Sequence, residues 1–235
     1  MRFSYDSDSG FGITDPDVVR LNDGTYLMFL SFGINIIKAT SLSSSGTFTY
    51  DPAFGWNQGG VPGSYNFACA VRTFTCYQNG IHVAIYDEKS GRLNYEGIAL
   101  SPPPFGIIAD PSVIQVDDRY LMFYKYATSP QIPPSEHEIY LATSADGINW
   151  SPHTQNRFIG RGSVPGAVYH NGVIYVYYCG LVPKATGKPN GDMGLAVSWD
   201  KGETFAFSVI TIEGKTPAGA VDPSAIVVDT IEVNN

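Results

Sequence analysis

Five apolar segments with closely similar beginnings recur along the chain, and this repeat constrains the fold more than any other feature. The segments read TDPDVVRL, FACAVRTF, ADPSVIQV, SVPGAVYH and VDPSAIVV, beginning at Thr14, Phe67, Ala109, Ser163 and Val221. Their spacing of about 40 to 60 residues is that of one supersecondary unit repeated around an axis or along a stack. Because proline is tolerated where a strand begins, the three Asp-Pro segments predict equivalent positions for Asp15, Asp110 and Asp222.

Each repeat divides into four short strands. The first strand ends at a turn signal such as Asn22-Asp23-Gly24 or His170-Asn171-Gly172, and such turns favour hairpins because they require positive φ. The second strand alternates aromatic and aliphatic residues, as in TYLMFLS and VIYVYYC. Antiparallel strands of about five residues, repeated without helical periodicity, are typical of β-propeller blades. A stacked β-solenoid is the alternative, but it needs shorter and more uniform repeats.

The predicted fold is therefore all-β, a five-bladed β-propeller of four-stranded antiparallel blades in a single domain spanning residues 1–235. A chain that is 43% hydrophobic and 13% aromatic has enough apolar side chains to form the hydrophobic core of such a domain. The fifth repeat is incomplete, because the sequence stops soon after its first strand. Residues 2–6 (RFSYD) resemble residues 47–51 (TFTYD) of a fourth strand, so we expect the N-terminal strand to close the ring as the outer strand of blade five.

The charge of the chain limits its partners. A formal net charge of −8, without a basic stripe, disfavours nucleic acid and anionic membranes and is compatible with a neutral ligand such as a sugar. No apolar stretch is as long as a membrane span, and no signal peptide follows Met1. We expect a cytoplasmic or a processed secreted protein; the oligomeric state is not predicted. The four histidines lack metal-ligand spacing, so no cofactor is expected unless a cation such as calcium occupies the channel.

Strand direction places the inner-strand aspartates on the face that also carries the long loops, where function usually resides. On this face Trp56 and Tyr65 are candidates to stack on a sugar ring, or else they fill gaps between blades. Arg72, expected within the inner strand of blade two, is a candidate to bind a hydroxyl or carboxylate; a structural salt bridge is the alternative. Residues 198–205 fit the S-x-D-x-G-x-T-F pattern called an Asp box, whose aspartate fixes a turn on the opposite face.

The segments TDPDVVRLNDGTYLMF and ADPSVIQVDDRYLMFY resemble blades one and three of the five-bladed glycoside hydrolases, which include the arabinanase/xylosidase and invertase/levanase families. In repeat organisation the resemblance covers essentially the whole chain. It implies that Asp15 is the catalytic base or nucleophile, and that Asp110 orients the acid and tunes its pKa. Paired carboxyl groups around an axial pocket can flank a glycosidic bond in this way.

Blade four departs from the pattern of that clan. The E-G-P segment that carries its general acid corresponds to Ser163-Val164-Pro165, and serine cannot protonate a leaving group. Asp222 could act as the acid instead, bind a cation, hydrogen-bond to sugar hydroxyls or merely cap a strand; Glu136, Glu138 and Asp192 are further candidate acids. Loss of the acid would cost about two to four powers of ten in rate.

Three functions therefore stay open. The first is a glycoside hydrolase acting on a neutral oligo- or polysaccharide through its inner-strand carboxylates. The second is a carbohydrate-binding propeller that has lost the blade-four acid and retains Ser163 as a binding residue. The third is a scaffold for protein interactions.

Overall fold

The computed structural model describes residues 2–3, 13–32, 35–55, 65–69, 72–77, 80–102, 106–129, 136–152, 158–179, 193–210, 212–213 and 223–227. For residues 2–3, 13–15, 65–69, 72–77 and 158 it describes the backbone alone. Every regular element in these ranges is a β-strand. No helix in the described ranges is long and apolar enough to cross a membrane.

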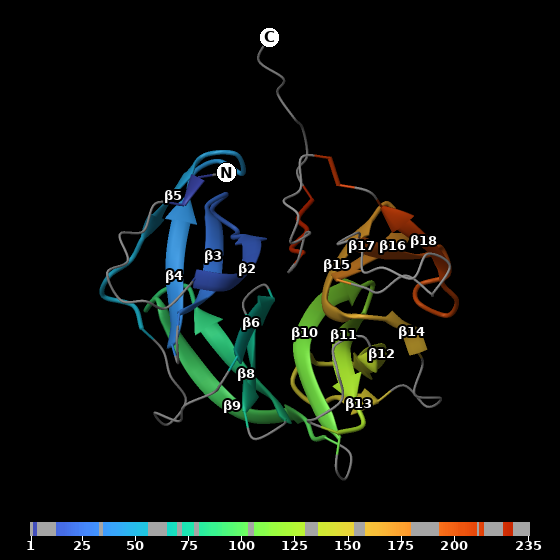
Figure 1. The fold of residues 1–235 in the computed structure, drawn as a ribbon. Helices are drawn as coiled ribbons and strands as arrows, with labels where there is room; N and C mark the ends of the chain where they lie inside the picture. The colour runs from blue at the N-terminus through green and yellow to red at the C-terminus, as the bar shows by residue number, and fades with distance from the viewer. Residues whose placement is uncertain are drawn as a thin grey trace.

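The strands form four sheets that stand around a common axis (Figure 1). Blade one contains β2 (Ile13–Arg20), β3 (Tyr26–Phe32), β4 (Asn35–Ser41) and β5 (Thr47–Tyr50). Blade two contains β6 (Tyr65–Cys69), β7 (Arg72–Tyr77), β8 (Gly80–Asp87) and β9 (Arg92–Leu100). Blade three contains β10 (Ile107–Val116), β11 (Arg119–Ala127) and β12 (Glu138–Ser144), with β13 (Ser151–Pro152) and β14 (Phe158–Arg161) at its outer edge. Blade four contains β15 (Ser163–His170), β16 (Val173–Cys179), β17 (Met193–Ser198) and β18 (Ala206–Ile210).

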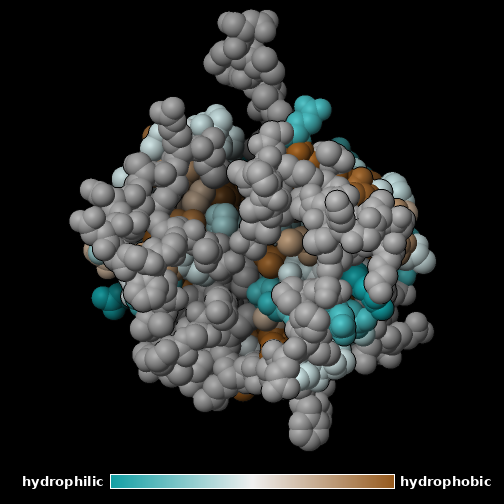
Figure 2. Space-filling view, viewed as in Figure 1, coloured by the Kyte–Doolittle hydropathy of each residue, from teal (hydrophilic) through white to brown (hydrophobic). Residues whose placement is uncertain are grey.

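In β3 and in the middle of β11 both faces of the strand are buried, because the blade is packed between two neighbours, whereas in β16 buried residues alternate with half-buried ones. In β3, Leu27 and Phe29 pack toward blade two, whereas Met28 and Leu30 belong to a cluster that includes Ile226. Burial of both faces explains why these strands are almost entirely apolar and aromatic. In Figure 2 the apolar side chains on this face lie mainly deep between the sheets, and hydrophilic ones gather over blade three.

Residues 223–227 lie in the gap between blade one and blade four (Figure 1). Ile226 packs against the core of blade one, and the carbonyl of Pro223 lies against Gly166 of β15. This is where the inner strand of a fifth blade belongs, so the arrangement is consistent with five blades. The predicted all-β propeller of four-stranded antiparallel sheets is confirmed.

The N-terminal strand is not where the sequence comparison placed it. β1 (Arg2–Phe3) pairs in parallel with β5, with Arg2 opposite Thr47 and Phe3 opposite Phe48. It therefore extends the outer edge of blade one and does not close blade five. The unpaired hydrogen-bonding groups of an edge strand such as β5 attract an added strand. The similarity between residues 2–6 and residues 47–51 did not reveal that these segments are neighbours.

Blade two also differs from its expected division. The segment from Phe67 to Phe74 is not one strand: β6 ends at Cys69 and β7 begins at Arg72, and the two form an antiparallel pair. Arg72 therefore begins the second strand and does not lie within the inner one. Tertiary pairing decides this division, because the apolar run continues through residues 67–74 without a turn signal.

The turn at residues 198–205 is held by its own side chains, on the face away from the beginnings of the inner strands. Asp200 accepts hydrogen bonds from the Ser198 hydroxyl and from the Thr204 N–H, each at 2.8 Å. The Gly202 N–H donates to Ser198 Oγ at 2.8 Å. The hydrogen bonds that Asp200 accepts, first among them the one from the Thr204 hydroxyl, hold its pKa below its usual range. The Asp200 carboxylate therefore stabilises the conformation of this turn.

Candidate functional site

Three inner strands deviate from regular pairing at the same point of the repeat. The register shifts between Thr14 and Asp17 in β2, between Ala109 and Ser112 in β10, and between Ser163 and Gly166 in β15. Each shift contains the proline, which cannot donate to the ladder. A bulge leaves residues unpaired and turns their side chains in a new direction. The fold thus offers equivalent irregular positions around one end of the axis.

Asp110 occupies the bulge of β10 in an unusual conformation. Its φ is +52°, and the residue is only 6% exposed. Asp110 Oδ2 lies 2.5 Å from the Nζ of Lys125, which is on the neighbouring strand β11. This contact is an ion pair by distance, without the alignment of a good hydrogen bond. Because burial of an unpaired charge is costly, Lys125 stabilises the carboxylate and fixes its position.

Asp15 of β2 corresponds to Val164 of β15, and Ser163 directly precedes that position. Asp15 falls within the bulge of β2, where the structure describes its backbone. Ser163 begins β15 opposite Cys179 of β16 and is partly exposed. The strands that carry Asp15, Asp110 and Ser163 therefore surround the same end of the axis.

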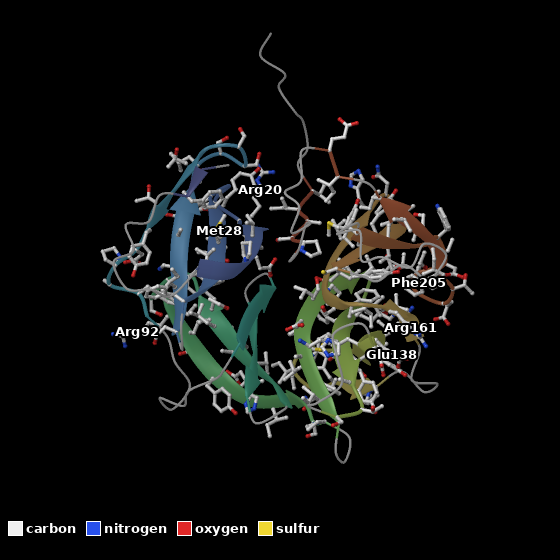
Figure 3. The ribbon with its side chains drawn as sticks, in the orientation of Figure 1. Arg20, Met28, Arg92, Glu138, Arg161 and Phe205 are labelled. Carbon is white, nitrogen blue, oxygen red and sulfur yellow. The ribbon has the colours of Figure 1, made fainter. Side chains whose placement is uncertain are left out.

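The other candidates are placed less completely. Tyr65 and Arg72 lie on β6 and β7, and their side chains are outside the described residues. Trp56 and Asp222 lie outside the described residues altogether. Glu138 is on the third strand of blade three, where it accepts a hydrogen bond from the Tyr140 hydroxyl at 2.9 Å. Figure 3 shows Glu138 beside the outer part of that blade and away from the axis, which disfavours it as an acid for an axial site.

Asp17 is an axial carboxyl that the sequence reasoning missed. Its side chain lines the channel, and Ser224 Oγ donates a hydrogen bond to its Oδ1 at 3.4 Å. Burial raises the pKa of Asp17 to about 7, although the hydrogen bonds from Ser224 and Val18 act in the opposite direction. The signal was present in the repeat: the residue after each proline is Asp17, Ser112, Gly166 or Ser224, and all four line the same cavity.

The channel is narrow at this level. The cavity bounded by these residues has a volume of about 30 Å³, which is about the share of one water molecule in the liquid. The Ala167 N–H donates to Ser112 Oγ at 2.9 Å, so the inner strands of blades three and four are joined directly. A wider cavity of about 230 Å³ continues along the inner strands past Arg20, Gln115 and Tyr169 toward the hairpin face. A sugar ring therefore cannot enter the narrow level.

A channel cation finds little support in the described residues. None of them form a cluster of three or more His, Cys, Asp or Glu side chains able to hold a metal ion. Calcium takes six to eight oxygen ligands, and the narrow cavity is lined by Asp17, Ser112 and Ser224 among small apolar residues. The side chains of Asp15 and Asp222 lie outside the described residues, so calcium in the channel remains an expectation from the sequence.

Comparison with solved structures identifies the fold. An α-L-arabinanase from Penicillium chrysogenum, solved with arabinobiose, superposes with a TM-score of 0.58 at 12% identity, covering 87% of this chain and 68% of the arabinanase. A thermostable family-43 glycoside hydrolase gives a TM-score of 0.62 at 13% identity, covering 88% and 74%. Sucrose-6-phosphate hydrolase from Lactobacillus gasseri gives 0.55 at 15% identity, covering 80% and 45%.

The chain shares the β-propeller fold of these glycoside hydrolases. By sequence alone, no family and no curated protein matches it. At 12 to 15% identity, the fold is what the structures have in common. The chemistry of this propeller must therefore be argued from its own residues.

Proposed function

We propose that this glycoside hydrolase-like propeller binds a neutral oligo- or polysaccharide at the axial end of its inner strands and cleaves a glycosidic bond there. The observation that carries the proposal is Asp110. A buried carboxylate in a bulge, at positive φ and paired with a partly buried lysine, is an arrangement that costs stability and is typical of functional sites.

Asp15 is the proposed base or nucleophile. It stands in the β2 bulge at the position that Asp110 has in β10. In glycoside hydrolysis one carboxylate attacks the anomeric carbon or activates a water, while an acid protonates the leaving oxygen. Asp110, held by Lys125, is proposed to position the acid and, by its negative charge, to help it keep its proton.

Asp222 is the proposed proton donor. It directly precedes Pro223, whose carbonyl lies against Gly166 in the inner strand of blade four. Ser163, in the same strand, occupies the position where the resembled clan carries its acid. Asp17 is a poorer candidate because it lies at the narrow level of the channel, past the proline of the bulge, and otherwise lines only the wider cavity that leads toward the hairpin face.

Hydrolysis of a panel of arabinose, xylose, fructose and galactose glycosides tests this proposal. We expect the parent to release one of these sugars, and Asp15→Asn and Asp222→Asn each to lower kcat by at least about a hundredfold. Asp118→Asn, an exposed substitution in a hairpin on the opposite face, is the matched control. Full activity of Asp15→Asn would remove the assignment of the base.

A carbohydrate-binding propeller without catalysis is the second candidate, and the Ser163-Val164 pair favours it. A binding site needs aromatic and hydrogen-bonding groups but no proton donor. The double variant Ser163→Glu/Val164→Gly restores the E-G-P pattern on the existing bulge. If the parent binds sugar without cleaving it, the appearance of hydrolysis in this variant identifies the missing acid as the cause.

A further inference from the structure

A second cavity lies between blades two and three, separate from the axial channel. It has a volume of about 240 Å³, which corresponds to about eight water molecules in the liquid. Blade two contributes Leu100 together with the residues that follow β9, and blade three contributes strands β10 to β13. Its described lining consists of Leu100, Ser101, Pro102, Ile108, Tyr124, Tyr126, Tyr140 and Pro152.

Strand alternation separates this cavity from the candidate catalytic residues. In β11, Tyr124 and Tyr126 point to one face and Lys125 to the other, as successive residues of a strand must. Lys125 reaches Asp110, whereas the two tyrosines face blade two. None of the residues that line this cavity lines either axial cavity. A ligand could therefore occupy it independently of the axial site.

Three tyrosines give the cavity a mixed surface. The ring of Tyr140 packs edge-on against that of Tyr126 with centroids 5.0 Å apart, and lies 6.3 Å from that of Tyr124. The Tyr140 hydroxyl donates to Glu138 Oε2, which fixes the direction of that ring. Burial raises the pKa of both Tyr124 and Tyr140 to about 12, so both phenols are protonated at neutral pH; Tyr140 donates its hydrogen bond to Glu138 and can accept a hydrogen bond from a ligand. The described lining contains no charged residue, which disfavours an ionic ligand.

We propose that this cavity is a second saccharide site that holds one ring of a neutral sugar. Apolar ring faces and fixed hydroxyl groups together suit a ligand that has apolar C–H faces and many hydroxyls. The volume fits a single ring, and Ser101 is exposed on the lining. Binding here requires no proton donor, so the inference goes beyond the proposed hydrolysis and does not depend on it.

Fluorine NMR of protein labelled with 3-fluorotyrosine tests the site directly. The Tyr126 resonance is assigned as the one lost in Tyr126→Phe, and arabinobiose, xylotriose and galactose are titrated as probes at millimolar concentration. We expect at least one probe to shift the Tyr126 resonance in a saturable manner. The shift should persist in Asp15→Asn, which alters the axial site alone.

Two tryptophan variants make the test specific. Ser101→Trp places a large ring over the cavity and should weaken the binding by about tenfold or more, about 1.4 kcal/mol. Leu42→Trp adds the same ring in blade one, where Leu42 is 90% exposed, and should leave the shift unchanged. A Tyr126 resonance that no probe moves, or that moves equally in Ser101→Trp, overturns the proposal. Absence of hydrolysis by the parent would overturn the proposed catalysis and leave this test intact.

Discussion

The inner strands of blades three and four have the same backbone conformation at their bulges but carry chemically different side chains there. Asp110 and Val164 both precede proline, both lie in a bulge, and have φ values of +52° and +51°. One presents a buried carboxylate held by a lysine, and the other a branched apolar side chain that rarely adopts positive φ. The repeat therefore specifies the backbone of the site, while the side chain at the bulge varies independently of it.

Replacing Asp110 by the residue of blade four should have the largest effect. Asp110→Val leaves Lys125, whose side chain is 20% exposed, without its partner. We expect a loss of about 3 kcal/mol in the free energy of unfolding, because an uncompensated buried charge remains. Urea denaturation measures this loss.

The double variant Asp110→Val/Lys125→Met is the control for the Lys125 charge that Asp110→Val leaves without a partner. It removes the lysine as well and should regain most of the lost stability, because replacing both partners by apolar groups is often tolerated. Sugar release should remain lost in both variants. Equal stability of Asp110→Val and the parent would contradict the role of the ion pair.

Gly166 is a second difference between the inner strands of blades three and four. It has no side chain, whereas blade three has Ser112 at the same position. A Cβ on Gly166 would lie 2.2 Å from the Pro223 carbonyl oxygen, so Gly166→Ala must displace the C-terminal segment. We expect a loss of about 2 kcal/mol, as in overpacked cores, with faster proteolysis near residues 223–227. Gly55→Ala, where nothing lies within 4 Å of the added Cβ, should change neither measurement.

Asp17, at this same point of blade one, should make stability depend on pH. Its folded pKa of about 7 lies above the ordinary value of 3.8, so its contribution is fully present below about pH 4 and is lost as the pH rises through 7. Because Asp17 keeps some exposure, we expect about 2 kcal/mol between pH 4 and pH 8. Chemical denaturation at each pH measures this slope, and Asp17→Asn should flatten it. An equal slope in parent and variant would assign the dependence to other groups.

Val164→Gly should have the smallest effect and the opposite sign. Glycine relieves about 1 to 2 kcal/mol of strain at positive φ and adds about 0.5 to 1 kcal/mol of chain entropy to the unfolded state. We expect the free energy of unfolding to increase by about 0.5 kcal/mol, which thermal unfolding measures. Val168→Gly, in the regular part of the same strand, should lose stability. A loss at both positions would show that Val164 is not strained.

The sequence predicted those features that repeat. The similar beginnings and the alternating second strands indicated the propeller, the inner strands of blades one, three and four, and the place of Asp110. Contacts between distant segments were not predictable, because no local pattern determines which free edge β1 joins or where β6 ends. Asp17 was overlooked because its neighbour Asp15 matched the repeat more closely. The tyrosine cavity requires β9 of blade two and β11 of blade three to come together, which no single repeat contains.

The contact between Asp17 and Ser224 joins residues 207 positions apart in the chain. During synthesis, the gap beside blade one therefore stays open until residues 223–227 have left the ribosome. Contacts of such long sequence separation are slow to form, because much chain entropy is lost before they form. The seam at residues 223–227 is thus expected to close last in folding and to open first under mechanical or thermal load.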